Sequence, residues 1–391
     1  VSRKTCNPFY FQPSNRPTSL LKEKRYFPNL NGLRCIAALL VIINHLEQAK
    51  EAYGIPNIYH YPIIQHTGRL GVGLFFVLSG FLITYLLLEE RGRFGNIDAK
   101  KFYLRRVFRI WPIYFLIVGL SLFIFPKWDI MYFPGANDFL NHHTAERLAL
   151  LALVLPNYAF VLYELPYWCA QTWSIGVEEQ FYYLWPWIIK YPNRKFAIFL
   201  TFISVTFLAL FGGIYLTGAS DAKQQSMLLT FIGQFRIQTM ILGGLCAYMV
   251  YKDKTRILNI LYRRDLQICV YAVLICMFIS GLHFTGFVEV YGVFFAYLIL
   301  NASCNPNSIV NFENRIMSYL GKISYGLYIY HVFVIVMISN ILVQILPDTA
   351  SFTFNFLYYT LSFAASVLVA FLSYNFLEKP ILAFKDRKFG R

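Results

Sequence analysis

One apolar stretch near the start of the chain, residues 33–49, carries two ionisable side chains, Arg34 and His45. They are eleven residues apart, about three helical turns, so on a helix they share one face and lie about 16 Å apart along its axis. Ionisable groups inside a membrane helix are costly and by default mark a functional site. Because imidazole exchanges protons near neutral pH, we predict that His45 is catalytic, as base or nucleophile. A snorkelling arginine and an interfacial histidine are the alternative interpretation.

A second basic group follows in the segment LRRVFRI, where Arg106 and Arg109 are three residues apart and would point the same way on a helix. Arginine forms bidentate contacts with phosphate, so we predict that Arg34, Arg106 and Arg109 bind an anionic donor molecule. The alternative is that basic residues gather at the cytoplasmic end of a membrane helix. That explanation fits Arg109 less well, because this residue lies deeper, just before Trp111 and Pro112.

The segment TWSIGVEEQFYYLWP places two carboxylates, Glu178 and Glu179, among aromatic side chains. Ser174 is predicted to cap the helix, and acids near a helix N-terminus stabilise its dipole. That alternative explains one exposed glutamate adequately and two poorly. We predict that Glu178 is the second catalytic residue and orients His45, as the third group of a catalytic arrangement does. The ten-span topology derived below starts the span of Glu178 from the outer side, at a depth comparable with that of His45. Glu179 and Trp173 are predicted to bind substrate.

The segment SYGLYIYH brings Ser324, Tyr328 and His331 within about 40° of one another on a helix. We predict that Tyr328 and His331 line the reaction cavity and bind substrate, although a structural, hydrogen-bonded histidine is an equal alternative for His331. Ser79 and Gly80 do not form a nucleophile elbow, because the first glycine of that motif is missing and no strand precedes it. These two residues are predicted to form a small-residue contact between helices.

The sequence indicates no metal site and no glycine-rich phosphate loop. Its seven cysteines stand without a CxxC pair, so we expect small apolar side chains and neither zinc ligands nor disulfides. His60, His66, His142 and His143 fit no metal motif and are expected to be solvated in outer loops. No metal is therefore predicted as a cofactor.

The amino-acid composition indicates the environment of the helices that position these residues. Of 391 residues, 57% are hydrophobic and 14% charged, against roughly 45–50% and about 25% in soluble domains. This excludes a disordered chain and an ordinary soluble enzyme, and it indicates a protein embedded in a lipid bilayer. The 35 basic and 20 acidic residues give a net charge of +15, which we interpret as an excess of Lys and Arg in cytoplasmic loops. A nucleic-acid partner would require a basic soluble domain, and the sequence indicates none.

Apolar runs near the length of about 20 residues that a membrane helix needs define the predicted spans. They are residues 33–49, 70–88, 107–125, 173–190, 196–216, 230–251, 266–283, 287–303, 318–343 and 354–377. The run 147–163 is flanked by prolines and is predicted to be a partial or re-entrant segment. Counting it as an eleventh span would invert the loop charges that follow it, so ten spans with both termini in the cytoplasm fit the charges best.

The predicted fold class is therefore all-α, a polytopic membrane bundle of about ten transmembrane helices plus the partial segment. We predict a cytoplasmic N-terminal arm over residues 1–28, one membrane domain over 29–380 and a basic cytoplasmic tail over 381–391. The N-terminal arm lacks the apolar core of a signal peptide.

Two functional classes fit this constellation. A secondary transporter of a small anionic or sugar substrate would hold ionisable groups near the bilayer midplane, often on broken helices of repeated halves. A membrane transferase would need a cytoplasmic anion site for an activated donor, a base deeper in the bundle and an opening for the acceptor. No internal repeat is visible, so the residues favour the transferase without naming the transferred group.

Six segments in family order resemble the acyltransferase 3 family of integral membrane acyltransferases. They are NLNGLRCIAALLVIINH (29–45), GVGLFFVLSGFLIT (71–84), FYLRRVFRIWPIY (102–114), QTWSIGVEEQFYYLWP (171–186), LGKISYGLYIYH (320–331) and NFLEKP (375–380). The resemblance implies about ten helices, an acyl-CoA donor, usually acetyl-CoA, and O-acylation of carbohydrates at the outer face. It also implies functional roles for Arg34, His45, Arg106, Arg109 and Glu178.

On this basis we expect acetyl-CoA to bind at the inner arginines with its thioester directed toward His45. The expected partners are the lipid bilayer, the acyl-CoA and a glycan or lipid-linked sugar acceptor that enters from outside. The expected location is a bacterial inner membrane. Because the chain ends soon after the last span, we also expect a transferase without the soluble esterase-like domain that some relatives carry.

Overall fold

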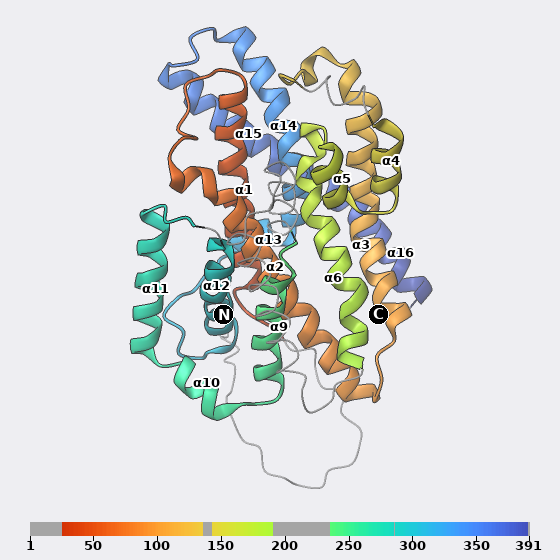
Figure 1. Ribbon diagram of the computed structural model, residues 1–391, viewed down its shortest axis with the longest axis vertical. Helices are drawn as coiled ribbons and strands as arrows, with labels where there is room; N and C mark the ends of the chain where they lie inside the picture. The colour runs from red at the N-terminus through yellow and green to blue at the C-terminus, as the bar shows by residue number, and fades with distance from the viewer. Residues whose placement is uncertain (1–25, 136–142, 191–234, 285, 390–391) are drawn as a thin grey trace, which may run out of the picture.

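This computed structural model describes residues 26–135, 143–190, 235–284 and 286–389 (Figure 1). These residues form helices and connecting loops, with no strand among them, so the all-α prediction is confirmed. The α-helices are α1 (Leu30–Ala52), α2 (Pro62–Phe94), α3 (Ala99–Gly119), α4 (Thr144–Ala152), α5 (Pro156–Tyr163), α6 (Trp173–Lys190), α9 (Ile237–Tyr251), α10 (Thr255–Leu261), α11 (Arg264–Ile279), α12 (Phe287–Cys304), α13 (Arg315–Lys322), α14 (Ser324–Ile345), α15 (Phe352–Ser373) and α16 (Lys379–Phe389). A π-helix, η5 (Tyr374–Glu378), joins the last two.

Several of these helices are long and apolar enough to cross a membrane. Within the described ranges, six segments meet that description: Leu30–Ala52, Pro62–Phe94, Ala99–Lys127, Phe287–Cys304, Ser324–Ile345 and Phe352–Lys388. The protein is thus an integral membrane protein by the length and composition of its helices. The predicted number of ten spans is not confirmed. The predicted span 196–216 and most of the N-terminal arm lie outside the described residues.

Two predicted segments are divided in the structure. The run 318–343, predicted as one span, is divided at Ile323 between α13 and α14. α13 is a separate short helix with its own N-terminal cap, since the Asn314 side chain accepts a hydrogen bond from the Met317 amide. The run 147–163, predicted as a partial or re-entrant segment, forms two short helices, α4 and α5. The break at Ile323 matters for function, since it starts α14 in the middle of the molecule (Figure 1).

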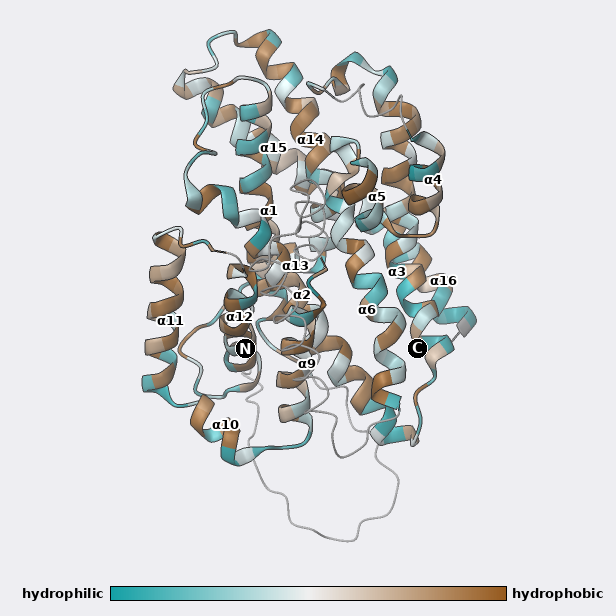
Figure 2. Cartoon of the chain, in the orientation of Figure 1, coloured by the Kyte–Doolittle hydropathy of each residue, from teal (hydrophilic) through white to brown (hydrophobic). Residues whose placement is uncertain are grey.

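Basic residues gather at one end of the molecule. The C-terminal ends of α2 and α6 and the loop between α9 and α10 lie at that end, whereas the loop between α14 and α15 lies at the opposite end (Figure 1). Arg91 and Arg93 close α2, Lys190 closes α6, and Lys252 and Lys254 follow α9. Hydropathic colouring shows hydrophilic residues at both ends and predominantly hydrophobic residues along α9, α11 and α12 between them (Figure 2).

The central helix α2 packs closely against α9 through two glycines. A side chain at Gly80 would meet the backbone of Met240, and one at Gly243 would meet the backbone of Val77. Small residues allow this close approach of membrane helices, so the predicted helix contact is confirmed for Gly80. Its neighbour Ser79 has a different role, described below.

We expect Gly80→Val to destabilise the fold by roughly 1–3 kcal/mol or more, because the added methyl groups must push α9 away. Gly119→Ala is the matched control, since nothing lies within 4 Å of a side chain at that position, and its effect should be small or stabilising. Denaturant-induced unfolding in bilayers or detergent checks both. Equal stability of the two variants would contradict the packing argument.

Two sequence interpretations of polar residues need correction. His66 was expected to be solvated in a loop, but it lies in α2 with 9% of its surface exposed, against the rings of His283 and Phe287. Ser174 was expected to cap α6, but it lies inside that helix, whose first residue is Trp173. The 3₁₀-helix η4 (Tyr167–Thr172) runs directly into α6, so no separate cap is needed.

Candidate active site

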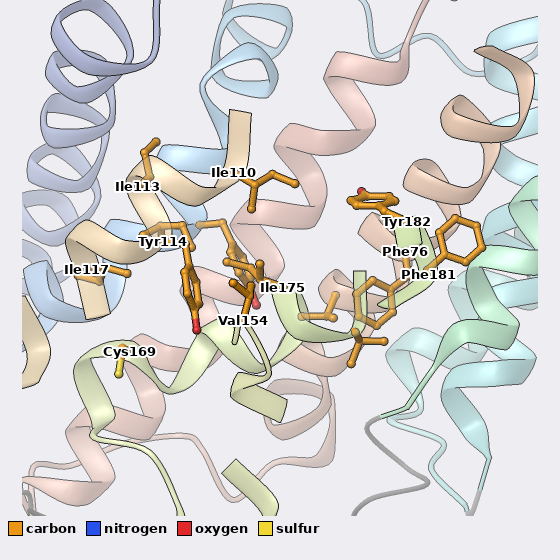
Figure 3. Packing of buried hydrophobic residues seen from close by; sticks show 14 of the residues in the cluster. Phe76, Ile110, Ile113, Tyr114, Ile117, Val154, Cys169, Ile175, Phe181 and Tyr182 are labelled. Atoms are coloured by element: carbon orange, nitrogen blue, oxygen red, sulfur yellow. The ribbon is translucent and has the colours of Figure 1, made fainter. Parts of the chain in front are cut away.

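A cavity of about 100 Å³ lies at the meeting point of α1, α2, α3, α6 and α14. Its polar lining consists of Arg34, Ser79, Arg106, Arg109, Ser174, Glu178, Tyr182, Ser324, Tyr325 and Tyr328. Its apolar lining includes Phe76, Ile110 and Ile175, which belong to the main core cluster together with Tyr182 (Figure 3). The cavity can hold several water molecules or a short acyl group.

The three predicted arginines come together at this cavity from two helices. Arg34 lies on α1, and Arg106 and Arg109 lie on α3. Among the residues that the structure describes, neither Arg34 nor Arg109 makes a hydrogen bond or an ion pair. Arg106 lies over the rings of Phe102 and Tyr182, at 5.7 and 5.6 Å from their centroids, and its buried Nε has no partner. Such guanidinium groups retain the capacity to bind an anion.

Glu178 lies in the same cavity and is held by two hydroxyl groups. Its Oε1 accepts a hydrogen bond of 2.9 Å from Ser79 Oγ, and its Oε2 accepts one of 3.0 Å from Tyr182 Oη. The carboxylate also interacts electrostatically with Arg34 and Arg106. The predicted pairing of Glu178 with His45 is not found among the hydrogen bonds of the described residues. The structure instead groups Glu178 with the arginines.

His45 has a different partner, the imidazole of His331. The distance between His331 Nε2 and His45 Nδ1 is 2.9 Å. Each ring also approaches a carbonyl of its own helix: His45 Nδ1 lies 3.1 Å from Val41 O, and His331 Nδ1 lies 3.2 Å from Leu327 O. His331 is completely buried and His45 partly so. Neither histidine lines the cavity, but both lie where α1 and α14 meet.

Tyr328 connects the cavity with the histidine pair. It lines the cavity, and its ring centroid lies 6.0 Å from that of His331. Its hydroxyl donates to Gln171 O at 2.9 Å and lies 2.7 Å from Ser174 Oγ, so it also fixes α14 to the start of α6. The predicted common face of Ser324, Tyr328 and His331 is therefore directed at the site region.

Trp173 and Glu179 lie beside the cavity without lining it. The Trp173 ring packs edge-on against Phe76 with centroids 6.3 Å apart. Glu179 Oε2 accepts a hydrogen bond of 3.4 Å from Trp111 Nε1, whereas its buried Oε1 has no partner. A role of Trp173 and Glu179 in substrate binding remains a prediction.

The sequence assigned no role at this site to several residues, among them Ser79, Tyr182 and Glu378. Ser79 was interpreted only as a helix contact, and Tyr182 only as an aromatic neighbour of the glutamates. Glu378 interacts electrostatically with Arg109 and ends the π-helix η5; such π-turns occur frequently at functional sites. Its sequence signal is the segment NFLEKP, one of the six segments that resemble the acyltransferase family.

The described residues contain no group of three or more His, Cys, Asp or Glu side chains able to hold a metal ion. The six described cysteines are all free thiols. The chemistry that this site offers is therefore that of arginines, a carboxylate, tyrosines and a histidine pair. Anion binding, proton transfer and acyl transfer are within the reach of such groups.

Comparison with known proteins agrees with this chemistry. The putative peptidoglycan O-acetyltransferase YrhL of Bacillus subtilis is 27% identical over 399 residues, covering 95% of this chain and 57% of that protein. The O-acetyltransferase OatA of Staphylococcus aureus is 28% identical over 402 residues, covering 94% of this chain and 60% of its own length. The chain thus spans less than two thirds of these relatives. No solved structure matches it. A family model described as an acyltransferase domain matches residues 27–375, and the chain belongs to that acyltransferase family.

Proposed function

We propose that this protein is a membrane O-acyltransferase that moves an acyl group, an acetyl group in the first instance, from acyl-CoA to a hydroxyl of a glycan. The observation that carries the proposal is the cavity in which Arg34, Arg106 and Arg109 stand together without ion pairs among the described residues. The family membership and the names of the relatives support acetyl transfer to a cell-envelope glycan as the reaction.

The arginines suit the donor because coenzyme A carries phosphates, which guanidinium groups bind by charge-assisted, bidentate hydrogen bonds. We propose that the phosphates bind at the side of the cavity formed by Arg106 and Arg109, with Glu178 holding Arg34 and Arg106 in place. The narrow cavity would then receive only the thioester arm, which passes Tyr328 toward His45.

The proposed reaction starts when the acceptor hydroxyl loses its proton to His45 Nε2 as its oxygen attacks the thioester carbonyl. The carbon–sulfur bond then breaks, and the departing thiolate of coenzyme A takes up the proton from His45. An ester and a free thiol result, and no other reactant is consumed. In the alternative route His45 attacks the thioester itself and carries the acyl group to the acceptor.

We further propose that the end rich in basic residues faces the cytoplasm of a bacterial inner membrane and that both termini lie on that side. Lys254→Cys and Ala350→Cys, both in exposed positions at opposite ends of the molecule, should then react with impermeant maleimide from opposite sides of the membrane. Only the second should react in intact cells. Labelling of both from outside would contradict the orientation.

The function itself is tested by mass spectrometry of surface glycans from cells with and without the protein. Loss of an acetyl mass in cells without the protein, restored by expression of the wild-type protein, would name the reaction and narrow down the acceptor. Purified protein in bilayers should also release free coenzyme A from acetyl-CoA when the acceptor is added. Uptake of a labelled solute without any acyl transfer would instead favour the transporter.

A further inference from the structure

The contacts of the two histidines allow only one arrangement of protons when both rings are neutral. A carbonyl oxygen only accepts hydrogen bonds, so His331 Nδ1 must carry a hydrogen to approach Leu327 O at 3.2 Å. His331 Nε2 is then an acceptor, and it lies 2.9 Å from His45 Nδ1. His45 Nδ1 must therefore carry a hydrogen, which also satisfies its 3.1 Å contact with Val41 O. The lone pair of His45 is left on Nε2.

We propose that His331 is a positioning residue for His45: it accepts the Nδ1–H of His45, so that the Nε2 lone pair of His45 is presented to the acceptor hydroxyl. This inference rests on the proposed acyl transfer. It gives His331 a role in orienting the base, in place of the substrate contact that the sequence suggested. His331 itself is completely buried and does not line the cavity.

The surroundings of the pair explain why a second histidine suits this position. The histidines lie between α1 and α14 next to an apolar core cluster that includes Ile42, Leu46, Val334 and Ile335. A buried carboxylate there would carry an unbalanced charge, which is costly in an apolar environment. A neutral imidazole fixes the ring of His45 without that cost. When His45 becomes an imidazolium during proton transfer, its hydrogen bond to His331 becomes charge-assisted and therefore stronger.

The kinetic test compares two substitutions in the full-length protein in bilayers. His331→Gln keeps an oxygen acceptor near the place of Nε2, whereas His331→Leu has a similar volume and no acceptor. We expect His331→Leu to lower kcat by about 100-fold, in the range that general-base catalysis contributes, with unchanged KM for donor and acceptor. His331→Gln should recover at least about a tenth of the wild-type kcat. Tyr330→Phe, which removes only a hydrogen bond to Ser373 from the adjacent position, is the control for folding.

Two results would overturn the inference. Near-normal kcat in folded His331→Leu would show that His45 acts without a hydrogen bond to His331. A raised KM for the acceptor at normal kcat would assign His331 to substrate binding. If neither His331 variant folds, ¹⁵N spectra of histidine-labelled wild type and His45→Ala test the hydrogen bond. The Nε2 signal of His331 should differ between these two proteins, and an unchanged signal refutes the hydrogen bond. If this difference is observed but the wild-type protein transfers no acyl group, the proposed function is refuted and the pairing of the two histidines is retained.

Discussion

Replacing His45 with alanine is expected to slow acyl transfer strongly and leave donor binding unchanged. The loss should reach about 10²–10⁴-fold in kcat, because a positioned general base contributes that much. Donor affinity should persist, since the arginines of the cavity remain and His45 does not line it. Steady-state kinetics and binding of labelled acetyl-CoA to purified protein check the two halves. His60→Ala, in an exposed loop, is the control and should retain full activity.

A folded His45→Ala variant that binds the donor and acylates the acceptor at a near-normal rate would show that the assignment is wrong. The same preparation separates the two routes of transfer. Incubating wild-type protein with labelled acetyl-CoA and no acceptor should leave no label on the protein if the hydroxyl attacks the thioester directly. Label recovered on a peptide that contains His45 would establish an acyl-enzyme.

The helical geometry around His45 was predictable because it follows from local periodicity. Arg34 and His45 share a face of α1 directed at α14, where Arg34 lines the cavity with Tyr328 and His45 contacts His331. The distance of eleven residues sufficed for that prediction. It did not indicate what α14 would present to that face, since the partner depends on the alignment of two helices whose contacting histidines are 286 residues apart in sequence.

Glu178 shows the limit of arguing from depth alone. The loop charges predicted that Glu178 and His45 lie at comparable depth, and they were therefore predicted to pair. In the structure Glu178 instead accepts hydrogen bonds from Ser79 and Tyr182. Depth along a membrane helix leaves the rotation of that helix undetermined, and rotation decides which neighbour a side chain meets.

Ser79 and Gly80, which are neighbours on α2, make different contacts that the sequence did not distinguish. Ser79 and Gly80 were predicted together to form a helix contact, but consecutive residues point about 100° apart on a helix. Gly80 consequently packs on α9 while Ser79 points to Glu178. The break at Ile323 was also not predicted, because the run 318–343 was interpreted as one span, whereas Arg315–Lys322 form a separate, amphipathic helix capped at Asn314.

Removing the guanidinium group of Arg109 is expected to weaken donor binding by about 10–100-fold, as hydrogen bonds to charged groups contribute about 1.5–3 kcal/mol each. Arg109 is exposed at the cavity and makes no hydrogen bond or ion pair within the described part of the chain, so the substitution removes only its electrostatic interactions, such as the one with Glu378. Arg109→Lys should fall between Arg109→Ala and the wild type, because it keeps the charge and loses the planar fork. Arg93→Ala, at the basic end but outside the cavity, is the matched control and should bind normally.

Titration of the purified variants with labelled acetyl-CoA measures these affinities. Repeating the titration with a short acyl thioester that lacks phosphates separates charge recognition from contacts with the acyl arm. The loss caused by Arg109→Ala should disappear with the short thioester if Arg109 binds phosphate. Unchanged affinity for acetyl-CoA in folded Arg109→Ala would remove Arg109 from the donor site. Because Arg34 lies on another helix of the same cavity, Arg34→Ala should then be the next variant tested, and a loss there would place the phosphates nearer α1 than α3.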